Sequence, residues 1–220
     1  MKTPRILNAE SIEIEERAAP PLERIKPHKW LSEEDLREYS TQERNGFELY
    51  VSRIAEEKMR NHSIRYAGEQ KEAMGLLLGW VYKENGRIYS LVKDIVTTDL
   101  ESTFVNVRFD RGAFEKLFQA LEDAGFNYIV TGWYHSHPGH GCFMSSTDLY
   151  TQRTYFGDRA HSAIVIDPMN MEIKAFYLEG KRIKNRIFAI YWDEYENPYY
   201  GTCVRKKVIK SNPNRVSPTE

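Results

Sequence analysis

"EAMGLLLGWVYKENGRIYSLVKDIV", residues 72–96, contains two apolar runs that are separated by a turn signal. The runs cover residues 72–82 and 87–96, and Asn85-Gly86 between them is a pair that two-residue hairpin turns favour. The first run is apolar at consecutive positions, which is typical of a strand covered on both faces. This stretch therefore predicts a hairpin whose first strand lies in the centre of a sheet.

The segments on either side of this hairpin alternate between helical and strand patterns. Apolar residues recur at helical spacing after Asp110, which predicts an amphipathic helix over residues 111–125. The other expected elements are, in chain order, a strand at 47–51, a helix from Ser52 to Gly68, a strand at 127–137, a helix over 145–157 and a hairpin over 162–178 around Asp167-Pro168. Because helices and antiparallel hairpins alternate irregularly, we expect a single mixed α/β (α+β-like) domain.

Composition divides the chain into four parts. Residues 1–46 are charged and interrupted by prolines, and we expect an N-terminal extension that is partly disordered or regulatory, with a short helix capped by Ser32. The globular domain covers residues 47–180. Residues 181–210 are rich in aromatic side chains and are expected to pack on this domain or extend it, whereas residues 211–220 are expected to form a disordered tail.

Charge and cysteine content exclude several classes of protein. The chain has 31 basic and 32 acidic residues, so nothing attracts it generally to nucleic acid or to anionic membranes. Cys142 and Cys203 are the two cysteines and lack CxxC spacing, which excludes a disulfide framework and a thiolate zinc knuckle. No apolar run approaches the roughly 20 residues of a membrane span, and the N-terminus lacks a signal-peptide core. We therefore expect a cytoplasmic protein without nucleic-acid or membrane partners.

The stretch "GWYHSHPGHGCFMSSTDLYTQ", residues 132–152, concentrates polar side chains at a strand end. His135 and His137 are two residues apart, so both project from the same face of the strand, and neutral imidazoles suit Zn²⁺. If Ser145 caps the following helix, Asp148 lies in its first turn, where the helix dipole favours the ionised carboxylate. Three ligands with an open fourth position indicate a catalytic zinc site.

Two further side chains can complete such a site. Glu72 begins an otherwise apolar strand, and its carboxyl can take a proton from a zinc-bound water and return it to a leaving amine. Ser145 lies eight residues after His137, and its hydroxyl can donate to an oxyanion that develops on an attacked carbonyl.

Each of these features has a simpler explanation when it is taken alone. A His-x-His pair is more often packing or surface polarity, and "SSTD" is more often only the start of a helix. Their occurrence together favours the metal site. His140 follows Pro-Gly on a turn and is interpreted as a rim residue, and Cys142 as a small packing residue.

The combination of Glu72, "HSHP" at 135–138 and "SSTD" at 145–148 resembles the JAMM (MPN-plus) zinc metalloproteases, the family of the proteasome-lid deubiquitinase and of signalosome and endosomal isopeptidases. "MGLLLG", "GWYHSHPG.GC" and "TQ" strengthen the resemblance, which covers about residues 47–180. It implies an MPN fold, a curved and mostly antiparallel sheet flanked by helices, similar to cytidine deaminases. It also implies one Zn²⁺ per chain with a bound catalytic water, ligated by His135, His137 and Asp148.

The same resemblance implies a reaction and its partners. Glu72 would be the general acid/base and Ser145 the oxyanion stabiliser in hydrolysis of an isopeptide bond between ubiquitin, or a ubiquitin-like protein, and lysine. Modifier conjugates would be the partners, together with a proteasome or its unfoldase. Two alternatives stay open: a non-catalytic MPN scaffold, and a JAMM hydrolase of another modifier or of a small-molecule amide.

The segment 97–110 occupies the place of the family's first insertion, which can pair with an extended modifier tail by strand addition. Phe104, Val105, Val107 and Trp133 are accordingly expected to contact substrate, although the segment also fits an ordinary edge strand. The chain is short around the Asp167-Pro168 hairpin, where lid-type enzymes carry a long second insertion, and the region after residue 180 does not resemble the long C-terminal helices of lid subunits. Both features favour an enzyme that acts alone or is loosely recruited.

Overall fold

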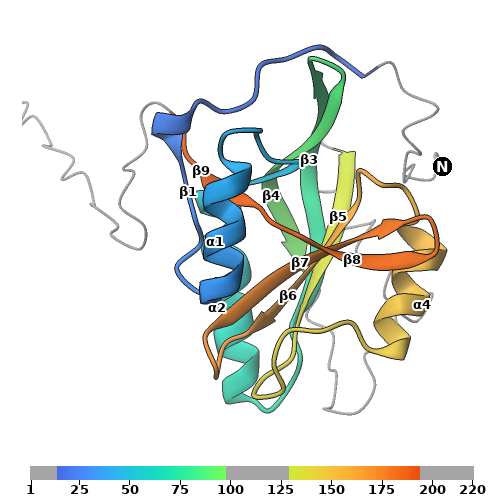
Figure 1. Cartoon of the computed structure of the whole chain (residues 1–220). Coiled ribbons are helices and arrows are strands. Elements are labelled where there is room, and N and C mark those ends of the chain that lie inside the picture. Colours follow the sequence, from blue (N-terminus) through green and yellow to red (C-terminus); the bar gives the residue numbers. More distant parts are fainter. Residues whose placement is uncertain (1–13, 98–128, 194–220) are drawn as a thin grey trace, which may run out of the picture.

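The computed structural model describes residues 14–97 and 129–193, and these form a mixed sheet flanked by helices (Figure 1). The strand order is β1-β9-β2-β4-β3-β5-β6-β7-β8. The strands are β1 (Ile25–Lys26), β2 (Leu49–Ser52), β3 (Met74–Glu84), β4 (Arg87–Thr97), β5 (Ile129–Ser136), β6 (Ser162–Asp167), β7 (Glu172–Glu179), β8 (Arg182–Arg186) and β9 (Ala189–Tyr191). The helices are α1 (Glu33–Gln42), α2 (Arg53–Gly68) and α4 (Ser146–Tyr155), with a 3₁₀ turn η2 (Leu22–Arg24). The expected α/β class is confirmed.

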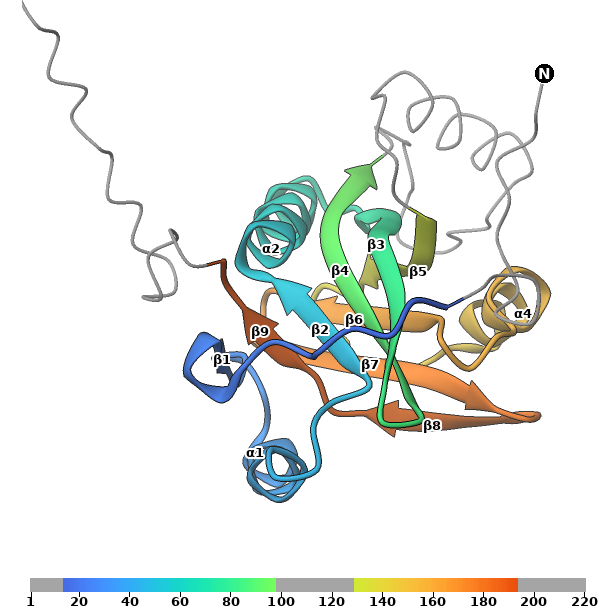
Figure 2. The same ribbon diagram turned by 90° about the horizontal axis from the view of Figure 1, so that it is seen from above.

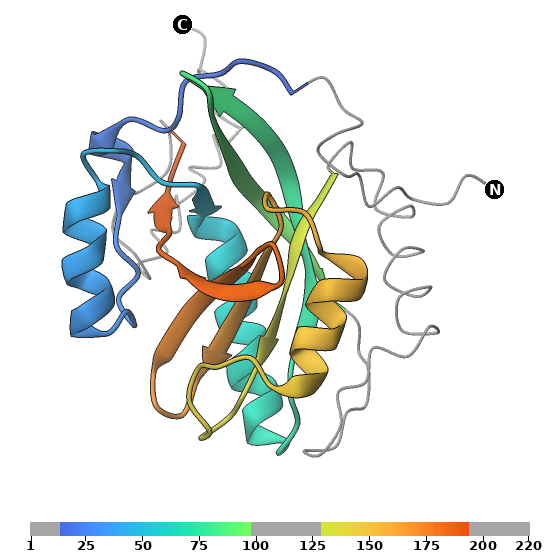
Figure 3. The same ribbon diagram turned by 45° about the vertical axis from the view of Figure 1, so that its right-hand side comes forward.

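Strand β3 lies between β4 and β5 and is antiparallel to both. Its side chains alternate between two cores: Leu77 packs in the cluster that includes α2, and Leu76 and Leu78 pack in the cluster on the α4 side. The prediction of a central strand covered on both faces is therefore confirmed. Figure 2 shows α2 and α4 on either side of the strands, and Figure 3 shows α1 far from α4.

The β3–β4 hairpin has the turn that its sequence predicts. Asn85 and Gly86 have φ angles of 50° and 83°, and positive values at both central positions define the type I′ turn. A bulge between Leu78 and Gly79 interrupts the register with β4. A Cβ at Gly79 would overlap the backbone carbonyl of Leu91, so only glycine permits this close approach.

Side-chain caps set the beginnings of the helices. Ser32 accepts a hydrogen bond from Asp35 N at the start of α1, and Ser52 accepts one from Ala55 N at the start of α2. Both caps are predicted by the sequence, because a short polar side chain can satisfy an orphan N–H of the first turn. None of the helices within the described ranges is both long and apolar enough to cross a membrane.

The described part of the N-terminal extension packs against the sheet. β1 pairs with β9, which in turn pairs with β2. The imidazole Nε2 of His28 lies 2.9 Å from Glu56 Oε1 on α2, and both side chains are buried. Residues 1–13, the predicted helix over 111–125 and the C-terminal tail lie outside the described residues.

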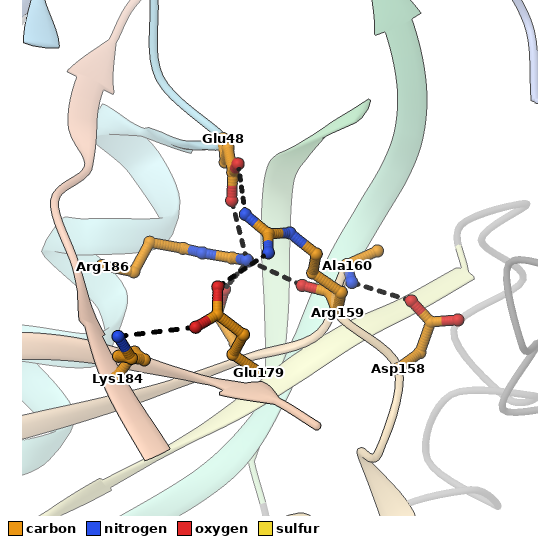
Figure 4. A network of polar contacts seen from close by, with 8 residues as sticks. Glu48, Asp158, Arg159, Ala160, Glu179, Lys184 and Arg186 are labelled. Atoms are coloured by element: carbon orange, nitrogen blue, oxygen red, sulfur yellow. Dashed lines mark hydrogen bonds and ion pairs between the residues drawn. The ribbon is translucent and has the colours of Figure 1, made fainter. Parts of the chain in front are cut away.

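An ion-pair network fastens β7 and β8 to the start of β2 (Figure 4). Arg186, at the end of β8, is 4% exposed and donates through Nη2 to Glu48 Oε2 at 3.0 Å and to the Arg159 carbonyl at 2.7 Å. Arg159 bridges Glu48 at 2.9 Å and Glu179 at 3.3 Å, and Lys184 reaches Glu179 at 3.4 Å. Residues 182–186, directly after the expected domain boundary, are thus an integral part of the sheet.

Candidate metal centre

The end of β5 and the first turn of α4 bring together the three expected ligands. The Nε2 atoms of His135 and His137 lie 3.4 Å and 3.5 Å from the same oxygen, Oδ2 of Asp148. Each side chain offers one ligand atom, all of them within 4.8 Å of one another, and all three residues are buried. Two imidazole nitrogens and one carboxylate oxygen form a donor set that zinc binds in catalytic sites.

Unsatisfied polar atoms support a cation at this position. Both ring nitrogens of His135 and Nδ1 of His137 are buried and have no hydrogen-bond partner among the described residues. Buried polar groups are normally hydrogen-bonded, and of these orphaned atoms His135 Nε2 is the one that faces the Asp148 carboxylate, where a cation can satisfy it. The residues present therefore fit a zinc ion.

The protonation states of the three side chains follow from burial and from their proximity. Burial lowers the pKa of His135 and outweighs the attraction of Asp148, which favours the neutral ring that a metal ligand requires. Burial also acts to lower the pKa of His137, but the hydrogen bond and charge of Asp148 and the charge of Glu72 raise it overall. Burial acts to raise the pKa of Asp148, but the two imidazoles and Ser145 lower it by more, so its carboxylate stays ionised.

A capping box places Asp148 in the first turn of α4. Ser145 Oγ accepts a hydrogen bond from Asp148 N at 3.2 Å, and Asp148 Oδ2 accepts one from Ser145 N at 2.7 Å. The predicted N-cap is therefore confirmed. The oxygen that faces the two imidazoles is the same oxygen that caps the helix, and Ser145 retains a hydroxyl hydrogen that it can donate.

Glu72 approaches the centre from the β3 side. Met74 lies opposite His135 in the antiparallel register, so continuing the register by two residues places Glu72 opposite His137. Burial raises the pKa of Glu72 to about 7, with smaller opposing contributions from His137, which lowers it, and Asp148, which raises it. A carboxyl group that titrates near neutral pH can both accept and return a proton.

Trp133, which the resemblance places among the substrate contacts, is buried beneath the centre. Its side chain is 1% exposed and stacks on the His135 ring, with 4.4 Å between ring centroids and 13° between planes. Its indole Nε1 donates to Gln152 Oε1 on α4 at 2.7 Å. Trp133 therefore supports the ring of His135, an expected metal ligand, from behind. Phe104, Val105 and Val107, the other expected substrate contacts, lie outside the described residues.

The loop after His137 is held by a residue whose role the sequence analysis missed. Asp167, at the end of β6, accepts hydrogen bonds from Gly139 N at 2.8 Å and Gly141 N at 2.7 Å. These glycines have φ angles of 80° and 79°, a region that favours glycine. Asp167 was interpreted only as part of a hairpin turn, although an aspartate that ends an apolar strand often bonds nearby backbone N–H groups.

Two other residues of this loop, His140 and Cys142, have the surroundings that the sequence predicts. His140 is exposed, as expected of a rim residue. Cys142 Sγ donates to the Val165 carbonyl at 3.3 Å, and burial raises the pKa of this thiol to about 12, which fits packing and not nucleophilic attack. Phe143 was not singled out by the sequence analysis; it is 49% exposed, and its ring centroid lies 4.8 Å from that of His137.

Comparison with known proteins identifies the family. Residues 47–158 match the family described as JAB1/Mov34/MPN/PAD-1 ubiquitin protease. The chain belongs to this family. The predicted family resemblance and MPN fold are thereby confirmed, and the mixed sheet with its flanking helices is the α/β arrangement expected of an MPN domain.

Several MPN proteins are similar to this chain. The 26S proteasome regulatory subunit RPN11 of Eremothecium gossypii is 39% identical over 125 residues, 55% of this chain and 38% of that protein. The COP9 signalosome complex subunit 5 of Debaryomyces hansenii is 32% identical over 154 residues, 68% of this chain and 30% of that protein. The Ubiquitin carboxyl-terminal hydrolase RPN11 of Saccharomyces cerevisiae is 38% identical over 125 residues, 55% of this chain and 39% of that protein. The matched part thus spans between 30% and 39% of these relatives.

Among solved structures, protein DSY2949 from Desulfitobacterium hafniense has a TM-score of 0.47 and 18% identity, covering 69% of this chain and 98% of that one. This likeness is too weak to carry an argument.

Proposed function

We propose that this chain is a zinc-dependent isopeptidase that removes ubiquitin or a ubiquitin-like modifier from lysine. The observation that carries the proposal is the convergence of two buried imidazoles and a carboxylate within 4.8 Å, next to a half-buried Glu72 whose carboxyl interacts with the charges of His137 and Asp148. Membership of a family described as ubiquitin proteases, and a relative named as a ubiquitin carboxyl-terminal hydrolase, support the choice of substrate.

Each residue of the site has a task in this reaction. His135, His137 and Asp148 would hold the zinc, which when bound supplies a Lewis acid that polarises the scissile carbonyl and acidifies water. Glu72, with a pKa near 7, takes the proton of the attacking water and gives it to the departing lysine amine. Ser145 donates its hydroxyl hydrogen to the oxygen of the carbonyl as charge develops there.

Replacement of the general base tests this proposal. Glu72→Gln is expected to retain one zinc per chain and to lose cleavage of a diubiquitin or modifier–lysine conjugate by about 10²- to 10⁴-fold. Glu69→Gln, three residues earlier and more than half exposed, is the matched control and should cleave normally. A chelator should abolish cleavage by the parent protein. Undiminished cleavage by Glu72→Gln would refute the mechanism.

The alternative functions make different predictions with the same protein. A non-catalytic scaffold would contain no stoichiometric zinc and would gain no activity on zinc addition, whereas this chain has all three candidate ligands together with Glu72. A hydrolase of another modifier or of a small amide would show its highest kcat/KM on that substrate when a panel of modifier conjugates and small amides is compared.

We also propose modifier conjugates as partners of this chain. A proteasome-like assembly is proposed as a further partner because relatives carry 26S proteasome names. Co-purification with proteasome particles tests the latter.

A further inference from the structure

Ser136 lies between the two histidines of the metal centre and is completely buried. Its Oγ accepts a hydrogen bond from Ala73 N at 2.7 Å, and its own N–H donates to the Ala73 carbonyl at 2.9 Å. In a regular antiparallel rung, the Ala73 N–H would bond to the backbone carbonyl of the opposite residue. The hydroxyl group therefore takes the place of a backbone acceptor at the rung just before β3 begins.

This pair of bonds fastens the residue next to Glu72. Residues 71–73 lie between α2 and β3 and belong to neither element. Gln70, just after α2, has a φ of 58°, so the chain changes direction immediately before this segment. The position of Glu72 relative to the ligands therefore depends on how the segment is attached to β5. Ser136 supplies two of the bonds that attach it.

The Ser136 hydroxyl does not itself face the metal centre. Alternation along β5 places the side chains of His135 and His137 on one face and that of Ser136 on the other. Its effect on the site must therefore pass through Ala73 to Glu72. We infer that Ser136 is a positioning residue that fixes the Glu72 carboxyl at its working distance from the His135–His137–Asp148 centre. This inference rests on the proposed function and adds the residue that sets its geometry.

Removing the hydroxyl separates metal binding from proton transfer. In Ser136→Ala, the buried Ala73 N–H loses its acceptor and the segment that carries Glu72 shifts, while the three ligands remain. We expect one zinc per chain, an unchanged KM and a kcat about 100-fold lower, the size of effect that a displacement of about 1 Å produces. Ser136→Thr keeps a hydroxyl at the same position and should restore most of the lost kcat.

A matched control accounts for stability. Ser90 on β4 is also completely buried, and its Oγ donates to the Ala160 carbonyl at 2.6 Å. It lies opposite Val81, whereas His135 lies opposite Met74, so roughly 23 Å of strand separates the two sites. Ser90→Ala should therefore lower the melting temperature and leave kcat unchanged.

Amide hydrogen exchange gives a measurement that does not depend on activity. The Ala73 amide should be protected in the parent and in Ser136→Thr, and should exchange at least tenfold faster in Ser136→Ala. Any one of three results for Ser136→Ala would overturn the inference. These are a kcat equal to that of the parent, a loss of bound zinc that parallels the loss of kcat, and an exchange rate of the Ala73 amide equal to that of the parent. A parent protein that binds zinc and cleaves no modifier conjugate would instead defeat the proposed function, and the exchange rates would still decide whether Ser136 holds the Glu72 segment.

Discussion

Asp167→Asn tests whether one buried carboxylate holds the loop between β5 and α4. Asp167 is completely buried and accepts five hydrogen bonds, from the backbone N–H groups of Gly139, Gly141, Met169 and Asn170 and from the Asn170 side chain. Oδ1 takes three of these bonds and Oδ2 takes two. The substitution keeps the volume of the side chain and replaces one of these acceptor oxygens with a donor.

The expected loss of stability follows from the two bonds that the amide cannot accept. With the asparagine oxygen at the Oδ1 position, its NH₂ group faces the N–H of Gly141 and the side-chain amide of Asn170. A hydrogen bond to a charged group contributes about 1.5–3 kcal/mol, so the variant should lose about 3–6 kcal/mol at neutral pH. For a domain of this size the melting temperature should fall by on the order of 10 °C.

The dependence of this loss on pH identifies its cause. Burial acts to raise the pKa of Asp167, but the hydrogen bonds from Gly139, Gly141 and Asn170 lower it by more, so the folded pKa lies below the ordinary value. The carboxylate therefore contributes its full stability above the unfolded pKa of about 3.9 and loses it as pH falls through the folded pKa. The stability difference between parent and variant should be constant from pH 7 to about 5 and should narrow below about 4.

Thermal unfolding with a chelator present is the appropriate assay, because bound zinc would add its own stabilisation. Asp158→Asn is the matched control: Asp158 Oδ1 accepts a bond from Ala160 N at 2.8 Å, which an asparagine oxygen can also accept. It should cost less than about 1 kcal/mol. Two results would refute the reasoning. One is a loss of stability in Asp167→Asn no larger than that in Asp158→Asn, and the other is a stability difference between parent and Asp167→Asn that grows as the pH falls.

Three other substitutions test the site and its surroundings. Asp148→Asn should abolish stoichiometric zinc after dialysis, because a neutral amide is a poor zinc ligand; retained zinc would contradict the ligand assignment. Trp133→Phe removes the donor to Gln152 and should cost about 1–3 kcal/mol in denaturant unfolding with zinc retained; an unchanged stability would argue against its supporting role. His28→Ala leaves buried Glu56 without its imidazole partner, so it should lower the free energy of unfolding by about 2–3 kcal/mol and make the chain before α1 easier to cleave by a protease. A variant as resistant to the protease as the parent would contradict the view that the His28–Glu56 contact holds this segment.

Short-range interactions made much of the fold predictable. The type I′ turn at Asn85-Gly86 and the helix caps at Ser52 and Ser145 depend on residues within three positions of one another, so the sequence alone specifies them. The same holds for the pairing of His135 with His137, because strand alternation is a local property. The turn and the caps are found where they were expected, and the side chains of His135 and His137 lie together beside Asp148.

Contacts between distant segments account for what was missed. Strands β1 and β9 have two and three residues, too few to show a periodic pattern, and they pair across almost the whole described chain. Trp133 lies on the same face as His135, as alternation requires, but Gln152 and Phe156 cover that part of the face. Local sequence gives no indication that a later helix will bury a strand residue.

The pairing of β1 with β9 protects an otherwise open edge of the sheet. β9 is buried along its length and pairs with β2 on one side, so without β1 its outer N–H and C=O groups would form an unpaired edge beside apolar side chains. Such edges are templates for strand addition by another chain. Cleavage between β1 and α1 would therefore do more than shorten the protein. It would release the strand that blocks this edge and expose a surface prone to self-association.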